Sequence, residues 1–578
     1  MTSNNKLLTV YRASAGSGKT FTLTVKFIEL LIERPENYRS ILAVTFTNKA
    51  TNEMKLRILS QLYGLANGLP DSDDYARAIE NSFLKRGKTI SRKQIMTNAA
   101  IALRYLLHNY NYFRIQTIDA FFQQVTRNMA KELNLNANFK LSLNDKQVEE
   151  KAVDEMIEQL LPKSDVMKWI LDYISDNISQ DLSWNVIGAI KDFGLTIYKD
   201  VYKEHEDELN KIFSNPAFFK DFETKMRAIM SKSEKFYEGV YASFCETLST
   251  HGVEISDFKN GTRGACGYFI KYGKGLREMS RKKDDDHFNK TAQAACESTS
   301  AWVKKQDMGT SLELAAEALM KLMNEAEDKR REYLGNYKSA ARTIEHISKL
   351  RLLGSINDKI DEANALANRF PLSATQMLLN RMIGDSDAPF IYEKIGTQIK
   401  HIMIDEFQDT SMAQWKNFKV LLNDCLAQHS TSLIVGDVKQ SIYRWRNSDW
   451  RLLNAIGKEF DNKDIGQTTL DTNCRSEANI INFNNVFFEE AAATEFGEFK
   501  DTFPGIGDIY RGSNIIQKVP DSKHGQQRGY VEIALLDKQD YRANTLARTV
   551  AIVKDLLARG VRQKSIAILT RTNSNITT

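Results

Sequence analysis

The stretch ASAGSGKT, residues 13–20, decides how the first part of the chain is expected to fold. It follows the apolar run LLTVY (7–11), which predicts a buried strand, and precedes FTLTVKFIELLIE (21–33), whose apolar spacing predicts a helix. A strand, a loop of small residues and a helix in succession point backbone N–H groups at a phosphate. The stretch therefore indicates a phosphate-binding loop, although Ala13 stands where the usual pattern has its first glycine.

The residue types in this loop suit contacts with a nucleoside triphosphate. Glycines allow close approach of the backbone, Lys19 would reach the β and γ phosphates, and Thr20 would bind Mg²⁺. The predicted nucleotide-binding residues are Ala13, Ser14, Ala15, Gly16, Ser17, Gly18, Lys19 and Thr20. A tight strand-to-helix turn with a surface lysine is the alternative interpretation.

The segment HIMIDEFQDT (401–410) offers the acidic residues that a nucleotide hydrolase needs. HIMI predicts a short strand, and Asp405 and Glu406 follow it at the end where open parallel sheets bind ligands. Asp405 would hold Mg²⁺ through water, and Glu406 would accept a proton from the attacking water. Because Lys19 lies 386 residues before Asp405, a large region must be inserted into the domain that holds both.

Composition is that of a soluble globular protein with several domains. The chain has 578 residues and a formal net charge of +5, and its apolar runs are far shorter than the roughly 20 residues of a membrane span. The N-terminus MTSNNK lacks the apolar region of a signal peptide. The five cysteines form no Cys-x-x-Cys pair, which disfavours a zinc site, an iron–sulfur cluster and a disulfide framework. A reduced, cytoplasmic protein is expected.

Seven segments, in order, resemble superfamily-one helicases of the UvrD/Rep type, most closely the RecB/AddA-like branch. They are ASAGSGKT, AVTFTNKATNEMKLRI (43–58), IQTIDAFFQQVTR (115–127), HIMIDEFQDTS (401–411), LIVGDVKQSIYRWRNSD (433–449), LDTNCRSEANIINFNNVFF (470–488) and SIAILTRTN (565–573). The resemblance implies an α/β fold of tandem RecA-like P-loop motor domains, built of parallel sheets flanked by helices. It also implies a large all-helical insertion in the first domain and an incomplete second domain.

The resemblance divides the chain into three predicted parts. These are a first motor domain with the ATP site (1–134 and 366–462), a helical insertion (135–365) and a partial second motor domain (463–578). Within the insertion, SLELAAEALMKLMNEAEDKRREYL (311–334) has the apolar stripe of a helix. In the last part, strands are expected at 529–536 and 564–572, with a helix near 540–559 ended by Gly560.

The resemblance also implies which residues would bind single-stranded DNA. Phe46 would stack on a base while Thr45 and Asn48 contact the DNA backbone. The other implied contacts are Thr117, Tyr443, Trp445 and Arg446. Read without the family, Phe46 is a core residue at a strand end, and Trp445 is an indole packed under two solvated cations.

By the same resemblance, Gln440 would sense the γ phosphate and Arg475 would reach it from the second motor domain as an arginine finger. The implied catalytic set is Glu406, Asp405, Lys19, Gln440 and Arg475, with ATP and Mg²⁺ as cofactors. Three features depart from the family. Cys474 replaces the aromatic residue that stacks on adenine, which leaves Phe21 as a substitute candidate; Asp119 stands where histidine is common; and no glutamine of the family type precedes the loop.

The function implied by the family is an ATP-dependent 3′–5′ DNA helicase or translocase in double-strand-break repair and recombination. Its expected partners are single-stranded DNA, duplex junctions and a nuclease, as a partner subunit or a C-terminal domain, with no membrane. The later motor motifs of the family are not found, so we expect an N-terminal fragment that binds nucleotide and DNA but hydrolyses nucleotide poorly. The alternatives are a P-loop ATPase switch acting on protein partners and a non-catalytic DNA-binding subunit of a helicase–nuclease complex.

Overall fold

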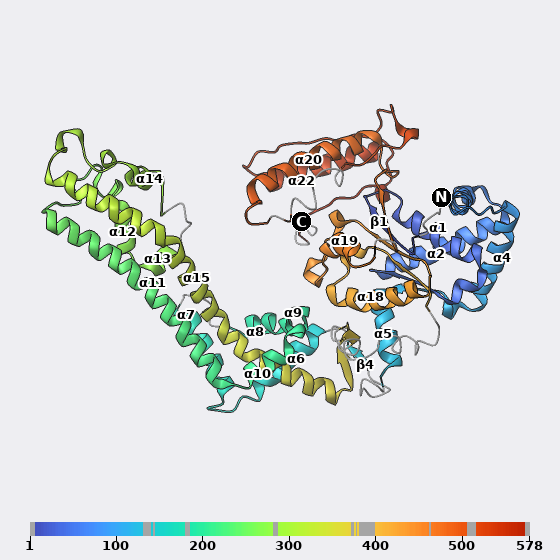
Figure 1. The fold of residues 1–578 in the computed structure, drawn as a ribbon, viewed down its shortest axis with the longest axis horizontal. Helices are drawn as coiled ribbons and strands as arrows, with labels where there is room; N and C mark the ends of the chain where they lie inside the picture. Colours follow the sequence, from blue (N-terminus) through green and yellow to red (C-terminus); the bar gives the residue numbers. More distant parts are fainter. Residues whose placement is uncertain are drawn as a thin grey trace.

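A sheet of six parallel strands lies in the right-hand half of Figure 1, around the label β1. The order of its strands is β3-β2-β6-β7-β1-β8. The strands are β1 (Leu8–Ala13), β2 (Ile41–Thr45), β3 (Arg114–Thr117), β6 (His401–Ile404), β7 (Ser432–Gly436) and β8 (Ile465–Leu470). The structure, a computed structural model, describes residues 6–130, 140–142, 145–179, 185–280, 287–371, 375–376, 379–380, 399–461, 464–503, 505 and 516–572. The expected mixed α/β class with a parallel sheet is confirmed.

Helices cover both faces of this sheet, which explains why β2 and β7 are buried at every residue. Ala43 and Val435 point into one core, which they share with α1 (Lys19–Glu33), α2 (Asn48–Asn67) and α4 (Arg92–His108). Their chain neighbours Val44 in β2 and Ile434 in β7 point into the other core. That core includes residues of α5 (Ile118–Asn128) and α18 (Met412–Ala427). The alternation of side chains along each strand therefore supplies two separate cores.

The strand β8 extends this sheet past residue 462, where the sequence predicted the first motor domain to end. Leu8 pairs with Ile465 and Ala13 pairs with Leu470, so β8 is an edge strand beside β1. Positions 462 and 463 of that predicted boundary lie outside the described residues, as does position 135 at the start of the predicted insertion. The three-part division of the chain stays a prediction.

A long helical arm leaves the sheet through a two-stranded pair (Figure 1). β4 (Lys140–Ser142) lies parallel to β5 (Arg369–Pro371), and the described residues between them form helices and turns without another strand. The longest helices are α11 (Pro216–His251) and α15 (Ser311–Leu366), with 36 and 56 residues. At 1.5 Å per residue, α15 is about 84 Å long.

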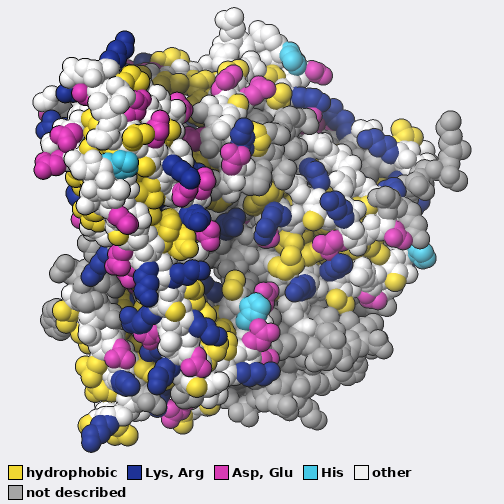
Figure 2. Space-filling view, turned by 60° about the vertical axis from the view of Figure 1, so that its left-hand side comes forward, with side chains coloured by type: hydrophobic (Ala, Val, Ile, Leu, Met, Phe, Trp, Pro, Cys, Tyr) yellow, Lys and Arg dark blue, Asp and Glu magenta, His cyan; other side chains and the backbone are white. Residues whose placement is uncertain are grey.

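The two long helices run side by side in opposite directions. The rings of Phe236 and Tyr333 stack at 4.2 Å near the outer part of the pair, and Arg351 bonds Glu223 nearer the sheet. The surface in Figure 2, which brings this side forward, mixes Lys and Arg with Asp and Glu. No helix of the described chain is long and apolar enough to cross a membrane.

A buried carboxylate lies near the base of the arm. Glu149 on α6 (Asp145–Glu158) is 0% exposed, and neither of its carboxylate oxygens has a hydrogen-bond partner among the described residues. A Cβ atom on Gly194 would lie 2.1 Å from Glu149 Oε1, so a larger residue there would require the carboxylate to move. Burial and then the charge of Glu150 raise the pKa of Glu149 to about 7, from an ordinary value of 4.5.

We expect Glu149→Gln to stabilise the chain at pH 8 and to have little effect near pH 4.5. Between these pKa values the folded state binds more protons than the unfolded state, so the free energy of unfolding falls as the pH rises from about 4.5 to 7. Removing the charge should recover about 3 kcal/mol above this window. Urea unfolding at the two pH values measures the difference, and Glu158→Gln, on an exposed site of the same helix, is the control. Equal effects of Glu149→Gln at both pH values would contradict the expectation.

Two strands predicted for the last part of the chain are wrong. Residues 529–536 and 564–572 carry no strand, and Tyr530 and Leu535 are largely exposed. A strand needs a neighbour that binds its N–H and C=O groups, and no described strand pairs with either segment. The predicted helix is confirmed as α22 (Tyr541–Ala558), and Gly560 follows it with a φ of +82°, as a C-terminal glycine should.

Candidate functional site

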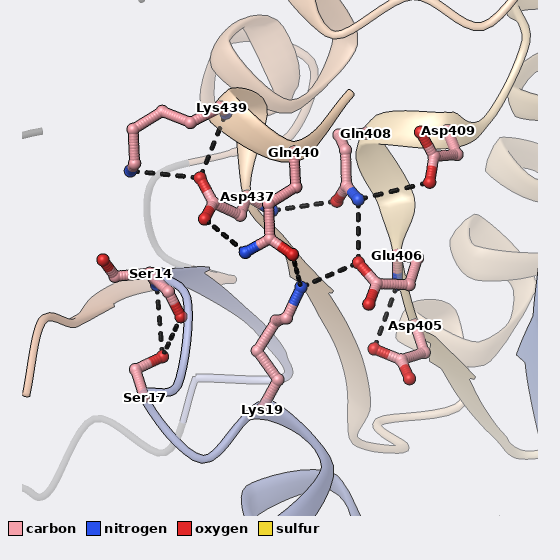
Figure 3. A network of polar contacts seen from close by, with 10 residues as sticks. All are labelled: Ser14, Ser17, Lys19, Asp405, Glu406, Gln408, Asp409, Asp437, Lys439 and Gln440. Carbon is pink, nitrogen blue, oxygen red and sulfur yellow. Dashed lines mark hydrogen bonds and ion pairs between the residues drawn. The ribbon is translucent and has the colours of Figure 1, made fainter. Parts of the chain in front are cut away.

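Strand order brings three distant loops together at one end of the sheet. β7 lies between β1 and β6, so the residues that follow β7 stand between those that follow the other two strands. Lys19, which begins α1 directly after the first loop, meets Gln440 and Glu406 from the other two loops in Figure 3. Parallel strands put all their carboxyl ends at the same edge, which is where such sheets bind ligands.

The loop after β1 has the backbone shape of a phosphate cradle. Gly16 and Gly18 have φ of +74° and +81°, and Gly18 is the N-cap of α1. Ser17 Oγ donates to Ser14 O at 2.7 Å and accepts from Ser14 N at 3.1 Å, which closes the loop on itself (Figure 3). The first N–H groups of a helix have no partner within it, so they are available to an anion at this end.

Lys19 connects the other two loops to the cradle. Its Nζ donates to Glu406 Oε2 at 2.8 Å and to Gln440 Oε1 at 3.2 Å. Gln440 Nε2 in turn donates to Asp437 Oδ2 at 2.7 Å. The lysine is only 11% exposed, so its charge is compensated mainly by these partners.

The two carboxylates after β6 differ in environment. Asp405 is buried, and burial followed by the charge of Glu406 raises its pKa to about 6, while Lys19 opposes the rise. Glu406 is partly exposed and holds a φ of +51°, which is unusual for a residue with a Cβ atom and is typical of functional sites. The charge of the buried Asp405 carboxylate is only partly compensated by Lys19, and it lies beside the candidate phosphate loop. Such a site suits a nucleotide with bound Mg²⁺, and Asp405 and Thr20 are the residues that would hold the metal.

The segment after β8 reaches back onto the cradle. Cys474 N donates to Gly16 O at 3.0 Å, and a Cβ atom on Gly16 would lie 2.3 Å from Asn473 Oδ1. This position therefore requires glycine both for its φ and for the close approach. Arg475 is exposed and lines a cavity of about 270 Å³ with Gly16 and Gln440.

Sequence reasoning missed Gln517. Its Nε2 donates to Ser14 Oγ at 3.0 Å and to Ala15 O at 3.2 Å, and its Oε1 accepts from Asn473 Nδ2 at 2.7 Å. The contact joins residues about 500 positions apart, and no local pattern around Gln517 signals it. Phe21, the substitute candidate for adenine stacking, packs against Tyr75 with ring centroids 4.6 Å apart.

Three of the predicted DNA-binding side chains gather around Phe46, beside the nucleotide loops. The rings of Phe46 and Tyr443 are 4.6 Å apart, and those of Tyr443 and Trp445 are 6.1 Å apart. The Arg446 guanidinium lies 4.7 Å from the Trp445 ring, which is 71% exposed. We call Phe46, Tyr443, Trp445 and Arg446 the aromatic cluster. The Trp445 ring and the Arg446 cation are exposed and Phe46 and Tyr443 are half-buried, an arrangement suited to stacking on bases.

The remaining predicted DNA contacts are placed differently. Thr45 is fully buried, and its hydroxyl bonds Thr51 Oγ1 at 2.7 Å, so the structure does not bring this side chain to the aromatic cluster. Asn48 is exposed at the first turn of α2. Thr117 caps α5 by accepting from Ala120 N at 3.2 Å, and Asp119 in the same turn accepts from Gln414 Nε2.

Comparison with known proteins adds a family and several relatives. A model of the UvrD/REP helicase N-terminal domain matches residues 2–461. The exonuclease/helicase subunit RexA of Lactococcus lactis subsp. cremoris is 23% identical, over 97% of this chain and 46% of the relative. The RecBCD enzyme subunit RecB of Borreliella burgdorferi is 24% identical, over 99% of this chain and 46% of the relative. The chain thus spans about half the length of these relatives.

Proposed function

The chain belongs to the UvrD/REP helicase family, and from this we propose that it carries the ATP-driven motor of a DNA helicase used in repair and recombination. The observation that carries the proposal is the meeting of Lys19, Gln440 and Glu406 beside the partly exposed aromatic cluster. The proposed nucleotide contacts and the proposed DNA contacts then lie at the same edge of one sheet. The polarity we propose is 3′–5′, as in the family that the motifs resemble.

In the proposed chemistry, Lys19 holds the β and γ phosphates, and Glu406 takes a proton from the water that attacks the γ phosphate. Mg²⁺ would neutralise phosphate charge and stabilise the leaving group. Arg475 lines the cavity beside Gly16, a position from which a guanidinium adds charge stabilisation. Gln440 bonds Lys19 directly, so it can respond to the presence of a γ phosphate.

Coupling to DNA follows from the length of one segment. Gln440 lies three residues before Tyr443. The η11 turn (Arg444–Arg446), which follows directly, contains Trp445 and Arg446 of the aromatic cluster. A shift at Gln440 on nucleotide binding would move the stacking rings with it, which links the two equilibria. Because the relative from Lactococcus lactis is an exonuclease/helicase subunit, we further propose that the motor works with a nuclease, as a partner subunit or in the same chain.

The deciding test measures ATP hydrolysis by the complete gene product with and without single-stranded DNA. We expect strong stimulation by DNA, and translocation on tailed substrates should run 3′–5′. Hydrolysis that ignores DNA would favour an ATPase switch acting on proteins. DNA processing that needs no hydrolysis would favour a non-catalytic DNA-binding subunit.

We expect Trp445→Ala to weaken the binding of single-stranded DNA by about tenfold or more. Stacking of a base on an aromatic side chain contributes about 1–3 kcal/mol, and this ring is exposed and backed by Arg446. Fluorescence anisotropy with a labelled oligonucleotide measures the effect. The control is Tyr63→Ala, which removes an exposed ring that lies on α2, outside the aromatic cluster. Unchanged DNA affinity with Trp445→Ala would mean that the exposed indole is not a stacking surface.

A further inference from the structure

Gln408 is a buried amide in the middle of the candidate site. It is 1% exposed, and it follows Glu406 in the turn η9 (Phe407–Asp409). Its Oε1 accepts from the backbone N–H of Asp437 at 2.9 Å. A backbone N–H can only donate, so this contact fixes which end of the amide is the oxygen. The –NH₂ end therefore has to face the other way.

That –NH₂ end faces two carboxylates (Figure 3). Gln408 Nε2 donates to Glu406 Oε2 at 2.7 Å and to Asp409 Oδ2 at 3.3 Å. Glu406 Oε2 thus accepts hydrogen bonds from both Gln408 Nε2 and Lys19 Nζ, whereas Glu406 Oε1 has no hydrogen-bond donor among the described residues. The arrangement holds one oxygen of Glu406 and leaves the other to accept a proton.

We propose that Gln408 is a positioning residue that orients Glu406 for the attacking water. The inference rests on the proposed ATPase function and deepens it. Once a nucleotide is bound, Lys19 has to share its charge between the phosphates and Glu406, and its hold on the carboxylate weakens. The Gln408 amide bonds Glu406, Asp409 and Asp437 rather than the phosphate loop, so its hydrogen bond to Glu406 persists when the lysine turns to the phosphates.

Gln408 also joins Glu406 to the γ-phosphate sensor. Asp437 binds Gln408 through its backbone N–H and Gln440 through its carboxylate, at 2.9 and 2.7 Å. A continuous path of hydrogen bonds therefore runs from Gln440 to Asp437, then to Gln408 and Glu406. These hydrogen bonds connect the loops after β6 and β7 and fix the position of Glu406 relative to Gln440, the proposed γ-phosphate sensor.

Two substitutions separate this role from simple support of the loop. Gln408→Glu keeps an oxygen for the Asp437 N–H but replaces the donor to Glu406 with a carboxylate. Gln408→Met has similar length and loses all three hydrogen bonds of the amide. If Gln408 only supports the loop, the glutamate variant should be the milder of the two, because it keeps the bond to Asp437. If Gln408 orients Glu406, the glutamate variant should be the more damaging for turnover.

The experiment measures DNA-stimulated ATP hydrolysis by the complete gene product at pH 8. We expect kcat to fall about 100-fold in Gln408→Glu and about tenfold in Gln408→Met, since misplacing a catalytic group by about 1 Å costs this much. KM and the affinity for a fluorescent ATP analogue should stay within about threefold, because the phosphate contacts are untouched. Thermal melting checks folding, and if the methionine variant fails to fold, the glutamate variant alone decides.

The same substitutions on a Glu406→Gln background complete the test. If Gln408 acts through Glu406, neither variant should lower the residual turnover further. The inference is overturned if kcat is unchanged in Gln408→Glu, if the loss appears in KM, or if the loss persists without Glu406. A Glu406→Gln variant as active as wild type would overturn this inference alone, whereas a wild-type protein without ATPase activity would refute the proposed function, and this inference with it.

Discussion

Lys19→Ala is expected to reduce the kcat/KM for ATP by about 1000-fold or more, because it removes the cation aimed at the developing phosphate charge. The structure adds a second loss. Glu406 and Gln440 both bond the Lys19 ammonium, so the loops after β6 and β7 lose the group that joins them to the cradle. Nucleotide affinity should therefore fall together with turnover.

Hydrolysis by the complete gene product and binding of a fluorescent ATP analogue to the chain measure the two losses. The control is Lys93→Ala, which removes an exposed lysine at the start of α4. Turnover within tenfold of wild type would show that this loop does not serve as the phosphate site. Loss of turnover with unchanged affinity for the ATP analogue would mean that Lys19 stabilises the transition state without contributing to nucleotide binding.

Glu406→Gln should have the opposite effect on affinity. We expect kcat to fall by about 100- to 10,000-fold, since the variant lacks the base that takes the proton from water. ATP binding should be retained or tightened, because Lys19 no longer shares its charge with a carboxylate. The strained φ of +51° at this residue is left in place, so the loop geometry should survive the change.

Rapid-quench measurement of a single turnover separates the chemical step from product release in this variant. Glu325→Gln, on an exposed site of α15, is the matched control. A variant that hydrolyses ATP at the wild-type rate would remove Glu406 from the mechanism. Asp405 or Asp409 would then be the remaining acidic candidates after β6, and the pKa of each is raised by burial, to about 6 and about 7.

Local pattern was enough to locate the parts of the site that follow single strands. HIMI predicted β6 at the residues where the structure has it, and the loop of small residues at 13–18 precedes α1 as predicted. Each feature depends on residues adjacent in the chain. The order of the strands depends on contacts between distant segments, so the position of β7 between Lys19 and Glu406 could not be read from any one stretch.

The incorrect or missed features share a physical cause. The apolar segments at 529–536 and 564–572 look like strands, but a strand exists only with a neighbour, and sequence pattern does not report one. Gln517 contacts Ser14 through a side chain whose role is set entirely by folding. The burial of the Thr45 hydroxyl against Thr51 is likewise set by folding, and its predicted contact with DNA stays a prediction.

The order in which the strands are synthesised has a consequence for the newborn protein. In the described sheet β1 pairs with β7 and β8 and with no strand made before them, so it stays without a neighbour until about 400 more residues have been added. At 5–20 residues per second, this wait lasts about 20–80 s. During that time an apolar segment next to the future phosphate loop is exposed as the ribosome works through the arm. The strand that leads into the candidate phosphate loop is thus the first of this sheet to be synthesised, yet its pairing waits for β7 and β8.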